Sequence, residues 1–151
     1  MIKIEKAGIK DAKEILALQK RAFEKEAVLY ADFDMEPLII TLDETIGEFK
    51  RSLVLKLTID GKIAGSVRGS AKGGVCTVKK LMVDPGMHNR GFGGALMNAL
   101  EKEFAGCRKF RLITGYKSEN NKHLYKKLGY KITGKRKIND RLSMVEMEKA
   151  V

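Results

Sequence analysis

The segment with the clearest chemical potential is a glycine-rich turn at residues 88–94, which reads His88-Asn89-Arg90-Gly91-Phe92-Gly93-Gly94. The neighbouring patterns place it between a strand and a helix, where backbone N–H groups converge and the helix dipole adds partial positive charge. Glycine has no Cβ, so the backbone can approach an anion closely, and Arg90 can add charge from the side. The turn suits a pyrophosphate, but the same glycines also suit an ordinary tight turn, and for the glycines alone the two interpretations weigh about equally.

Two common phosphate-binding motifs are excluded by their spacing. A dinucleotide fingerprint that begins at Gly91 requires glycine or alanine at position 96, which is Leu96. A P-loop requires Gly-Lys followed by Ser or Thr, which the chain lacks. The turn therefore belongs to neither of these two motif classes.

A second pair with chemical potential is Asn121 and Tyr125. The two residues stand four positions apart, so on a helix they share one face and can reach the same ligand. Spacing alone favours a packing role for Tyr125. The wider sequence around it changes that preference.

Taken together, these segments resemble the Gcn5-related N-acetyltransferase (GNAT) family. Its signature is Gln or Arg, two residues, Gly, one residue, and Gly or Ala, and residues 88–93 fit it with His88 at the first position. Residues 81–85, Leu-Met-Val-Asp-Pro, resemble the family's fourth strand, and residues 121–130 resemble its C-terminal Asn, Leu-Tyr, Leu-Gly-Phe/Tyr motif. The whole chain can be laid on the family order. The substitution by His88 affects a side-chain phosphate contact and not the backbone cradle.

The resemblance implies a fold, a co-substrate and a reaction. The fold is an α/β mixed sheet with an antiparallel N-terminal half and central parallel strands splayed around the cofactor, flanked by helices. Acetyl-CoA donates its acetyl group to a primary amine by direct attack in a ternary complex, and amides near the fourth strand stabilise the oxyanion. The implied binding residues are Leu81, Met82, Val83, His88, Asn89, Arg90, Gly91, Phe92, Gly93, Gly94 and Asn121.

The resemblance also gives Tyr125 the role of general acid toward the departing coenzyme A thiolate. A phenol titrates near ~10 and a thiol near ~8.5, so the donor is a sensible one. No equally clear general base is present. Asp34, Glu36 and Glu44 are weak candidates, and for each of them the pattern favours a solvated surface residue.

The elements that must position these residues follow from periodicity and turn residues. A strand at residues 2–4 precedes a helix that Asp11 and Glu14 begin as a capping box, and Thr41 caps a second helix after an irregular segment at 30–40. Three antiparallel strands at 53–59, 63–67 and 75–83 are joined by Asp60-Gly61 and Gly73-Gly74. The helix at 92–104 lies between the strand at 75–83 and a strand at 110–114, so these two strands should be parallel. A last helix, through Leu128, is followed by strands at 130–133 and 142–147. Residues 1–151 form one domain.

Charge is abundant and unevenly distributed. The net charge of +11 favours a polyanionic partner, which coenzyme A satisfies in part. The rival hypothesis is a basic nucleic-acid-binding module, which the lysine pairs support but which lacks interleaved aromatic residues. A third hypothesis is a coenzyme A-binding sensor without catalysis.

Residues 31–50 are the acidic exception, with six carboxylates and one lysine. We expect this section to act as a lid. It suggests a small-molecule or peptide amine acceptor that is cationic, such as a polyamine, a lysine-like amine or a basic peptide N-terminus. A solvated acidic helix is at least an equal alternative.

Cellular context follows from what the sequence lacks. It shows neither a secretory signal nor a membrane span, and its two cysteines and two histidines fit neither a disulfide framework nor a metal site. We expect a cytoplasmic protein with two buried, reduced thiols, no metal and no membrane partner, and a homodimer is compatible with the sequence.

Overall fold

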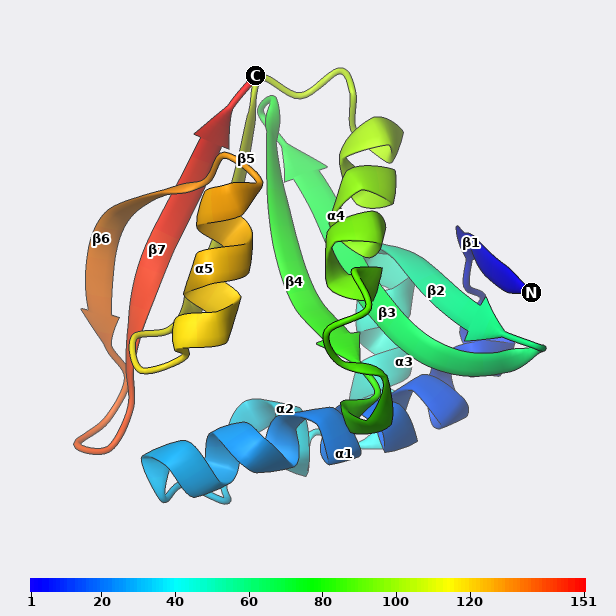
Figure 1. The fold of residues 1–151 in the computed structure, drawn as a ribbon, viewed down its shortest axis with the longest axis horizontal. Coiled ribbons are helices and arrows are strands. Elements are labelled where there is room, and N and C mark those ends of the chain that lie inside the picture. The colour runs from blue at the N-terminus through cyan, green and yellow to red at the C-terminus, as the bar shows by residue number, and fades with distance from the viewer.

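A seven-stranded mixed sheet, in the order β1-β2-β3-β4-β5-β7-β6, organises the computed structural model, which describes residues 1–151 (Figure 1). The strands are β1 (Ile2–Lys6), β2 (Leu53–Ile59), β3 (Lys62–Lys72), β4 (Val75–Val83), β5 (Lys109–Gly115), β6 (Lys131–Lys137) and β7 (Ser143–Ala150). The helices are α1 (Ala12–Tyr30), α2 (Glu36–Ile39), α3 (Leu42–Arg51), α4 (Phe92–Glu103) and α5 (Glu119–Lys127). Two short 3₁₀ turns cover Ile9–Asp11 and Pro85–Met87.

The topology confirms the expected α/β class. Strands β1 to β4 run antiparallel, and β4 pairs with β5 in parallel across the α4 crossover. Both predicted hairpin turns adopt left-handed backbone, with φ of 50° and 85° at Asp60 and Gly61 and of 59° and 78° at Gly73 and Gly74. Strand β7 lies between β5 and β6 although it follows β6 in the chain.

Helices cover both faces of the sheet because strand residues alternate between two hydrophobic cores. The larger core joins α4 and α5 to the strands through residues such as Leu55, Leu96 and Phe110. The smaller one joins α1 and α3 to the opposite face, where Ile15 and Phe49 meet Val54, Ile63 and Met82. In Figure 1, α1 crosses the lower end of the molecule while α4 and α5 lie in front of the strands.

The section between residues 30 and 51 differs from expectation. Helix α1 extends to Tyr30 and ends at Ala31 in left-handed backbone, and residues 36–39 form a one-turn helix instead of an irregular segment. Helix α3 buries Phe49 in the smaller core against the sheet. The interpretation of this section as a lid is therefore wrong for α3, because its apolar side belongs to a core.

One predicted helix cap is confirmed and one is wrong. Thr41 and Glu44 exchange hydrogen bonds at the start of α3 as a capping box. Asp11 and Glu14 do not form one. Asp11 instead accepts from the Gly8 N–H and from Lys56, and Glu14 accepts from the Ile63 N–H, so both carboxylates tie α1 to neighbouring segments.

Both cysteines are free and buried, as expected. Burial, with a smaller contribution from Cys107, raises the pKa of the Cys76 thiol to about 12. None of the helices combines the length and apolar character needed to cross a bilayer. No group of three or more His, Cys, Asp or Glu side chains is arranged to hold a metal ion.

Candidate cofactor cleft and active site

Strands β4 and β5 pair over only three residues of each strand, from Val75 to Thr77 on β4. Beyond Thr77, β4 stays paired with β3 up to Val83, while β5 stays paired with β7 up to Gly115. The two parallel strands therefore separate, and the backbone of β4 from residue 78 onward has no strand partner on its β5 side. A forked sheet of this kind exposes strand-edge hydrogen-bonding groups to a ligand.

The separation coincides with an irregularity in β4. Lys80 adopts left-handed backbone with φ of 55°, and the pairing register shifts between Ser66 and Arg68 on β3. Leu81 and Val83 pack against the larger core, whereas Met82 is buried in the smaller core. The predicted backbone segment 81–83 thus lies at the fork, with its side chains occupied in packing.

A cleft of about 1330 Å³ lies beside the fork. Among the predicted site residues, it brings together Leu81 from β4 with Asn121 and Tyr125 from α5. Met82, Val83 and the turn at 88–94 do not line it. The turn lies instead at the beginning of α4, which starts at Phe92.

The turn has the geometry of an exposed backbone cradle. Residues 88–91 are exposed, and Asn89 and Gly91 adopt left-handed backbone with φ of 64° and 78°. Helix α4 carries no acidic residue in its first turn, so its positive end is not neutralised by the chain itself. These features fit a pyrophosphate.

Gly93 has a packing role that the sequence did not indicate. A Cβ at this position would lie 3.2 Å from Cδ2 of Leu124 and 4.0 Å from side-chain atoms of Leu81 and Val83. At Gly94, the nearest contact would be an ordinary 4.0 Å to Leu124. Gly93 therefore lets α4 and α5 approach each other, while Gly94 has room for a side chain.

Tyr125 is nearly buried, at 7% exposure, and still lines the cleft. Burial, and then the negative charge of Glu26, raise the pKa of the Tyr125 hydroxyl well above its usual range. Its ring packs against Tyr130 with centroids 6.0 Å apart. The phenol therefore stays protonated at neutral pH, as a proton donor must.

The sequence did not indicate a hydrogen-bonded chain that ends at Glu26. The Ser118 hydroxyl donates to Glu26 Oε2 across 2.7 Å, and the Tyr30 oxygen lies 3.3 Å from Ser118 Oγ. Tyr30 also accepts the Lys117 N–H across 2.8 Å. The chain joins α1 to the start of α5, and Glu26 and Tyr30 line the same cleft as Tyr125. In the sequence, Glu26 is one of several Glu and Lys residues on α1, so no local signal distinguishes it.

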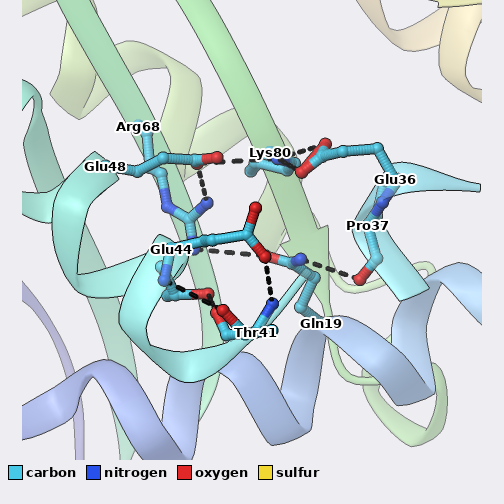
Figure 2. Close-up of polar contacts among 9 residues, drawn as sticks. Gln19, Glu36, Pro37, Thr41, Glu44, Glu48, Arg68 and Lys80 are labelled. Atoms are coloured by element: carbon cyan, nitrogen blue, oxygen red, sulfur yellow. Dashed lines mark hydrogen bonds and ion pairs between the residues drawn. The ribbon is translucent and has the colours of Figure 1, made fainter. Parts of the chain in front are cut away.

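A partly buried ionic network includes the cleft residues Glu36, Glu48 and Lys80 (Figure 2). Arg68, at 1% exposure, donates to Glu48 across 2.6 Å and to Gln19 across 3.1 Å. Lys80 Nζ lies 3.5 Å from Glu48 Oε1 and 2.8 Å from Glu36 Oε2. Burial lowers the pKa of Arg68, and the Glu48 carboxylate opposes that shift. The network ties α1, α2 and α3 to the irregular part of β4.

The cleft is acidic in a protein that is basic overall. Nine carboxylates line it, against five cationic side chains: Arg51, Lys79, Lys80, Arg111 and Arg136. Five of the nine form no ion pair with a protein cation, namely Glu26, Asp32, Asp34, Asp43 and Glu44. Such a lining attracts cations.

All three carboxylates suggested as general bases line the cleft. Glu36 pairs with Lys80 and Glu44 holds the Thr41 N–H, whereas Asp34 is exposed. Two of the three therefore already have partners in the protein.

Comparisons with known proteins agree with this geometry. A family model described as an acetyltransferase (GNAT) domain matches residues 20–151. An acetyltransferase of Yersinia enterocolitica is 29% identical over 140 residues, covering 84% of this chain and 97% of its own length. An acetyltransferase of Yersinia pestis is 34% identical over 95 residues, covering 58% and 67%.

Solved structures show the same fold. The ribosomal-protein-S18-alanine N-acetyltransferase of Escherichia coli superposes with a TM-score of 0.83 at 19% identity, covering 100% of this chain and 94% of the other. The PaiA N-acetyltransferase of Thermoplasma acidophilum, in complex with coenzyme A, gives 0.82 at 19% identity, covering 100% and 99%.

Proposed function

Because this chain belongs to the GNAT family of acetyltransferases, we propose that it moves the acetyl group of acetyl-CoA directly to a primary amine within a ternary complex. The observation that carries the proposal is the fork between β4 and β5, beside which Leu81, Asn121 and Tyr125 share one cleft. A strand edge, an amide side chain and a proton donor are the groups that acyl transfer from a thioester requires.

The co-substrate would be held along the fork. The turn at 88–94, with Arg90 beside it, would bind the pyrophosphate at the beginning of α4. The unpaired edge of β4 at residues 81–83 would hydrogen-bond the pantetheine arm, with Asn121 as a second contact. Backbone N–H groups near Leu81 and Met82 would polarise the thioester carbonyl.

Tyr125 would serve as the general acid. Its raised pKa keeps the phenol protonated until the C–S bond breaks. The phenol would then donate its proton to the departing thiolate. The alternative, a purely packing role against Tyr130, leaves the placement of Tyr125 on the cleft surface unexplained.

The acceptor would be a cationic small molecule or peptide amine. Support comes from the five cleft carboxylates without a protein cation, four of which lie in the acidic section at 31–50, namely Asp32, Asp34, Asp43 and Glu44. Two free thiols also fit a reducing compartment, so we propose the cytoplasm as the location.

A turnover screen tests this proposal. The purified protein would be incubated with acetyl-CoA and polyamines, lysine-like amines, neutral amines, amino acids and peptide N-termini, with free thiol release as the rate and product mass as the identification. We expect amine-dependent thiol release that is greatest for a cationic acceptor. Binding of acetyl-CoA without acetylation of any amine would contradict the proposal and favour a coenzyme A sensor.

A further inference from the structure

We infer that Glu26 is the general base that removes a proton from the incoming amine, an inference that rests on the proposed acetyl transfer. The residue lies on α1, outside the motif segments at 81–94 and 121–130. It is placed by a hydrogen bond from Ser118, which lies 92 positions away in the chain, and it shares the cleft with Tyr125.

The position of Glu26 is fixed by the hydrogen-bonded chain from Tyr30 through Ser118. The Ser118 hydroxyl donates its one hydrogen to Glu26 Oε2, so its oxygen accepts from the Tyr30 hydroxyl, and the Tyr30 oxygen accepts in turn from the Lys117 N–H. Tyr30 and Ser118 are 3% and 5% exposed. A Cβ at Gly115 would overlap the Tyr30 hydroxyl, so the end of β5 is shaped to admit this chain.

The arrangement leaves one oxygen of Glu26 available. Ser118 occupies Oε2, while Oε1 has no hydrogen-bond partner in the protein. The side chain is only partly buried and belongs to the cleft lining. The free oxygen can therefore accept a proton from an amine in the cleft and pass it to solvent.

Other cleft carboxylates are less suited to this task because they are already engaged. Arg68 and Lys80 hold Glu48, and Lys80 also holds Glu36. Asp32 accepts from Asn139 through one oxygen and from the Asp34 N–H through the other. Arg136 and Lys109 pair with the two carboxylates of β7, Glu146 and Glu148.

Asp34, Asp43 and Glu44 have no cation partner, but all three are exposed on or near α2 and α3. Glu26 is the carboxylate whose charge acts on Tyr125, the proposed acid. The titratable groups packed around this region include Tyr30 on α1, Tyr116 and Lys117 between β5 and α5, Lys122 on α5 and Lys135 on β6.

Glu26 and Tyr125 would divide the proton transfers of the reaction between them. The acceptor enters as an ammonium ion, and Glu26 takes one proton, which it releases to solvent. The freed lone pair forms the N–C bond to the acetyl carbonyl carbon, and the C–S bond breaks with its electron pair remaining on sulfur. Tyr125 protonates the sulfur and recovers a proton from the acylated nitrogen. The products are the amide, the free thiol and one proton.

The experiment compares Glu26→Gln with the unmodified enzyme and with Glu24→Gln, a control on the same helix that is exposed and outside the cleft. Glutamine keeps the size of the side chain and can still accept from Ser118, so folding is retained. We expect kcat/KM to fall by about 100-fold or more, with the acetyl-CoA dissociation constant unchanged, because general base catalysis contributes roughly 10² to 10⁴-fold. Glu24→Gln should leave both values unchanged.

Two further readouts separate a base from a mere binding charge. In Glu26→Gln, the rise of kcat/KM with pH that reports the base should disappear, and a weakly basic amine that is already neutral at the assay pH should show a smaller loss. Normal turnover by Glu26→Gln, or a raised KM with unchanged kcat, would overturn the assignment while leaving acetyl transfer intact. No turnover by the unmodified enzyme would overturn the proposed function itself and the base with it.

Discussion

Arg68 and Glu48 form an ion pair 2.6 Å long between β3 and α3, and the same Glu48 oxygen lies 3.5 Å from Lys80 at the irregular part of β4. Arg68 is 1% exposed and its guanidinium stacks over Phe49 at 5.2 Å from the ring centroid. The acidic wall of the cleft is therefore attached to the strand that would hold the thioester. Substitutions that break this ion pair should therefore change both the stability of the protein and the structure of the cleft.

Removing the anion of this pair should be more damaging than removing both charges. Glu48→Ala leaves the Arg68 cation buried without its principal partner, and we expect a loss of roughly 3 kcal/mol in the free energy of unfolding. Arg68→Met combined with Glu48→Leu should lose clearly less. Urea unfolding checks both. A change below about 0.5 kcal/mol for Glu48→Ala would show that the pair contributes little.

Stability should fall at alkaline pH. Burial holds the pKa of Cys76 at about 12 in the folded protein and raises the pKa values of Tyr125 and Tyr130. An unfolded chain loses these protons from about pH 8.5 for Cys and about pH 10 for Tyr, so above those values the folded state binds more protons and stability decreases with pH.

Urea midpoints at pH 7.5 and pH 10.5 measure this decrease. Cys76→Ala removes one contributor, so the variant, although less stable at pH 7.5, should lose less stability between the two pH values than the unmodified protein. An equal loss in both proteins would show that Cys76 does not contribute.

The cofactor turn can be tested at Gly94 more cleanly than at Gly93. At Gly93 any side chain meets Leu124, so Gly93→Asp mixes a packing defect with a charge effect. At Gly94 an Asp side chain has space and also suits the first turn of a helix. We expect Gly94→Asp to weaken acetyl-CoA binding at least 10-fold, since a carboxylate would oppose the pyrophosphate, with little change in melting temperature.

Gly94→Ala is the size control for that variant. It should retain most of the affinity measured by calorimetry. Equal affinities for acetyl-CoA in the Asp variant and the unmodified protein would remove the basis for placing the pyrophosphate at this turn.

Selection of a cationic acceptor should depend on exposed carboxylates of the cleft. Asp34→Asn with Asp43→Asn removes two charges that have no protein partner. We expect kcat/KM for a polyamine to fall about 3- to 10-fold at low salt and the difference to shrink at 0.5 M salt, because screening shortens the reach of surface charge.

The double variant Glu5→Gln with Glu24→Gln removes the same net charge away from the cleft and serves as the control. If both double variants lower kcat/KM for the polyamine equally, the hypothesis that the cleft carboxylates attract the acceptor is wrong. The same hypothesis is wrong if neutral amines are the best substrates of the unmodified enzyme.

Local signals explain which features could be predicted from the sequence. Asp60-Gly61 and Gly73-Gly74 specify their turns through left-handed backbone, and alternating apolar residues specify the strands they join. The spacing of Asn121 and Tyr125 placed both on one cleft surface. These features depend on residues close together in the chain.

The parts that escaped prediction depend on distant contacts. Ser118 and Glu26 are 92 positions apart, and Arg68 and Gln19 are 49 apart, so no periodic pattern relates them. Gly93 looked like a phosphate-binding glycine because its contact with Leu124 appears only when α4 and α5 are packed. The expectation of a lid was wrong for α3 for the same reason, because the burial of Phe49 depends on strands that follow it in the chain.

Acetyl transfer assisted by Tyr125 is tested most directly by comparing the unmodified enzyme with Tyr125→Phe. The two measurements are the initial rate of thiol release with the best amine and the affinity for acetyl-CoA. Phenylalanine keeps the ring packing, so binding should be unchanged while kcat falls on the order of 10 to 1000-fold. Equal kcat values would restrict Tyr125 to packing. An unmodified enzyme that binds acetyl-CoA but releases no thiol with any amine would contradict the proposed acetyl transfer itself.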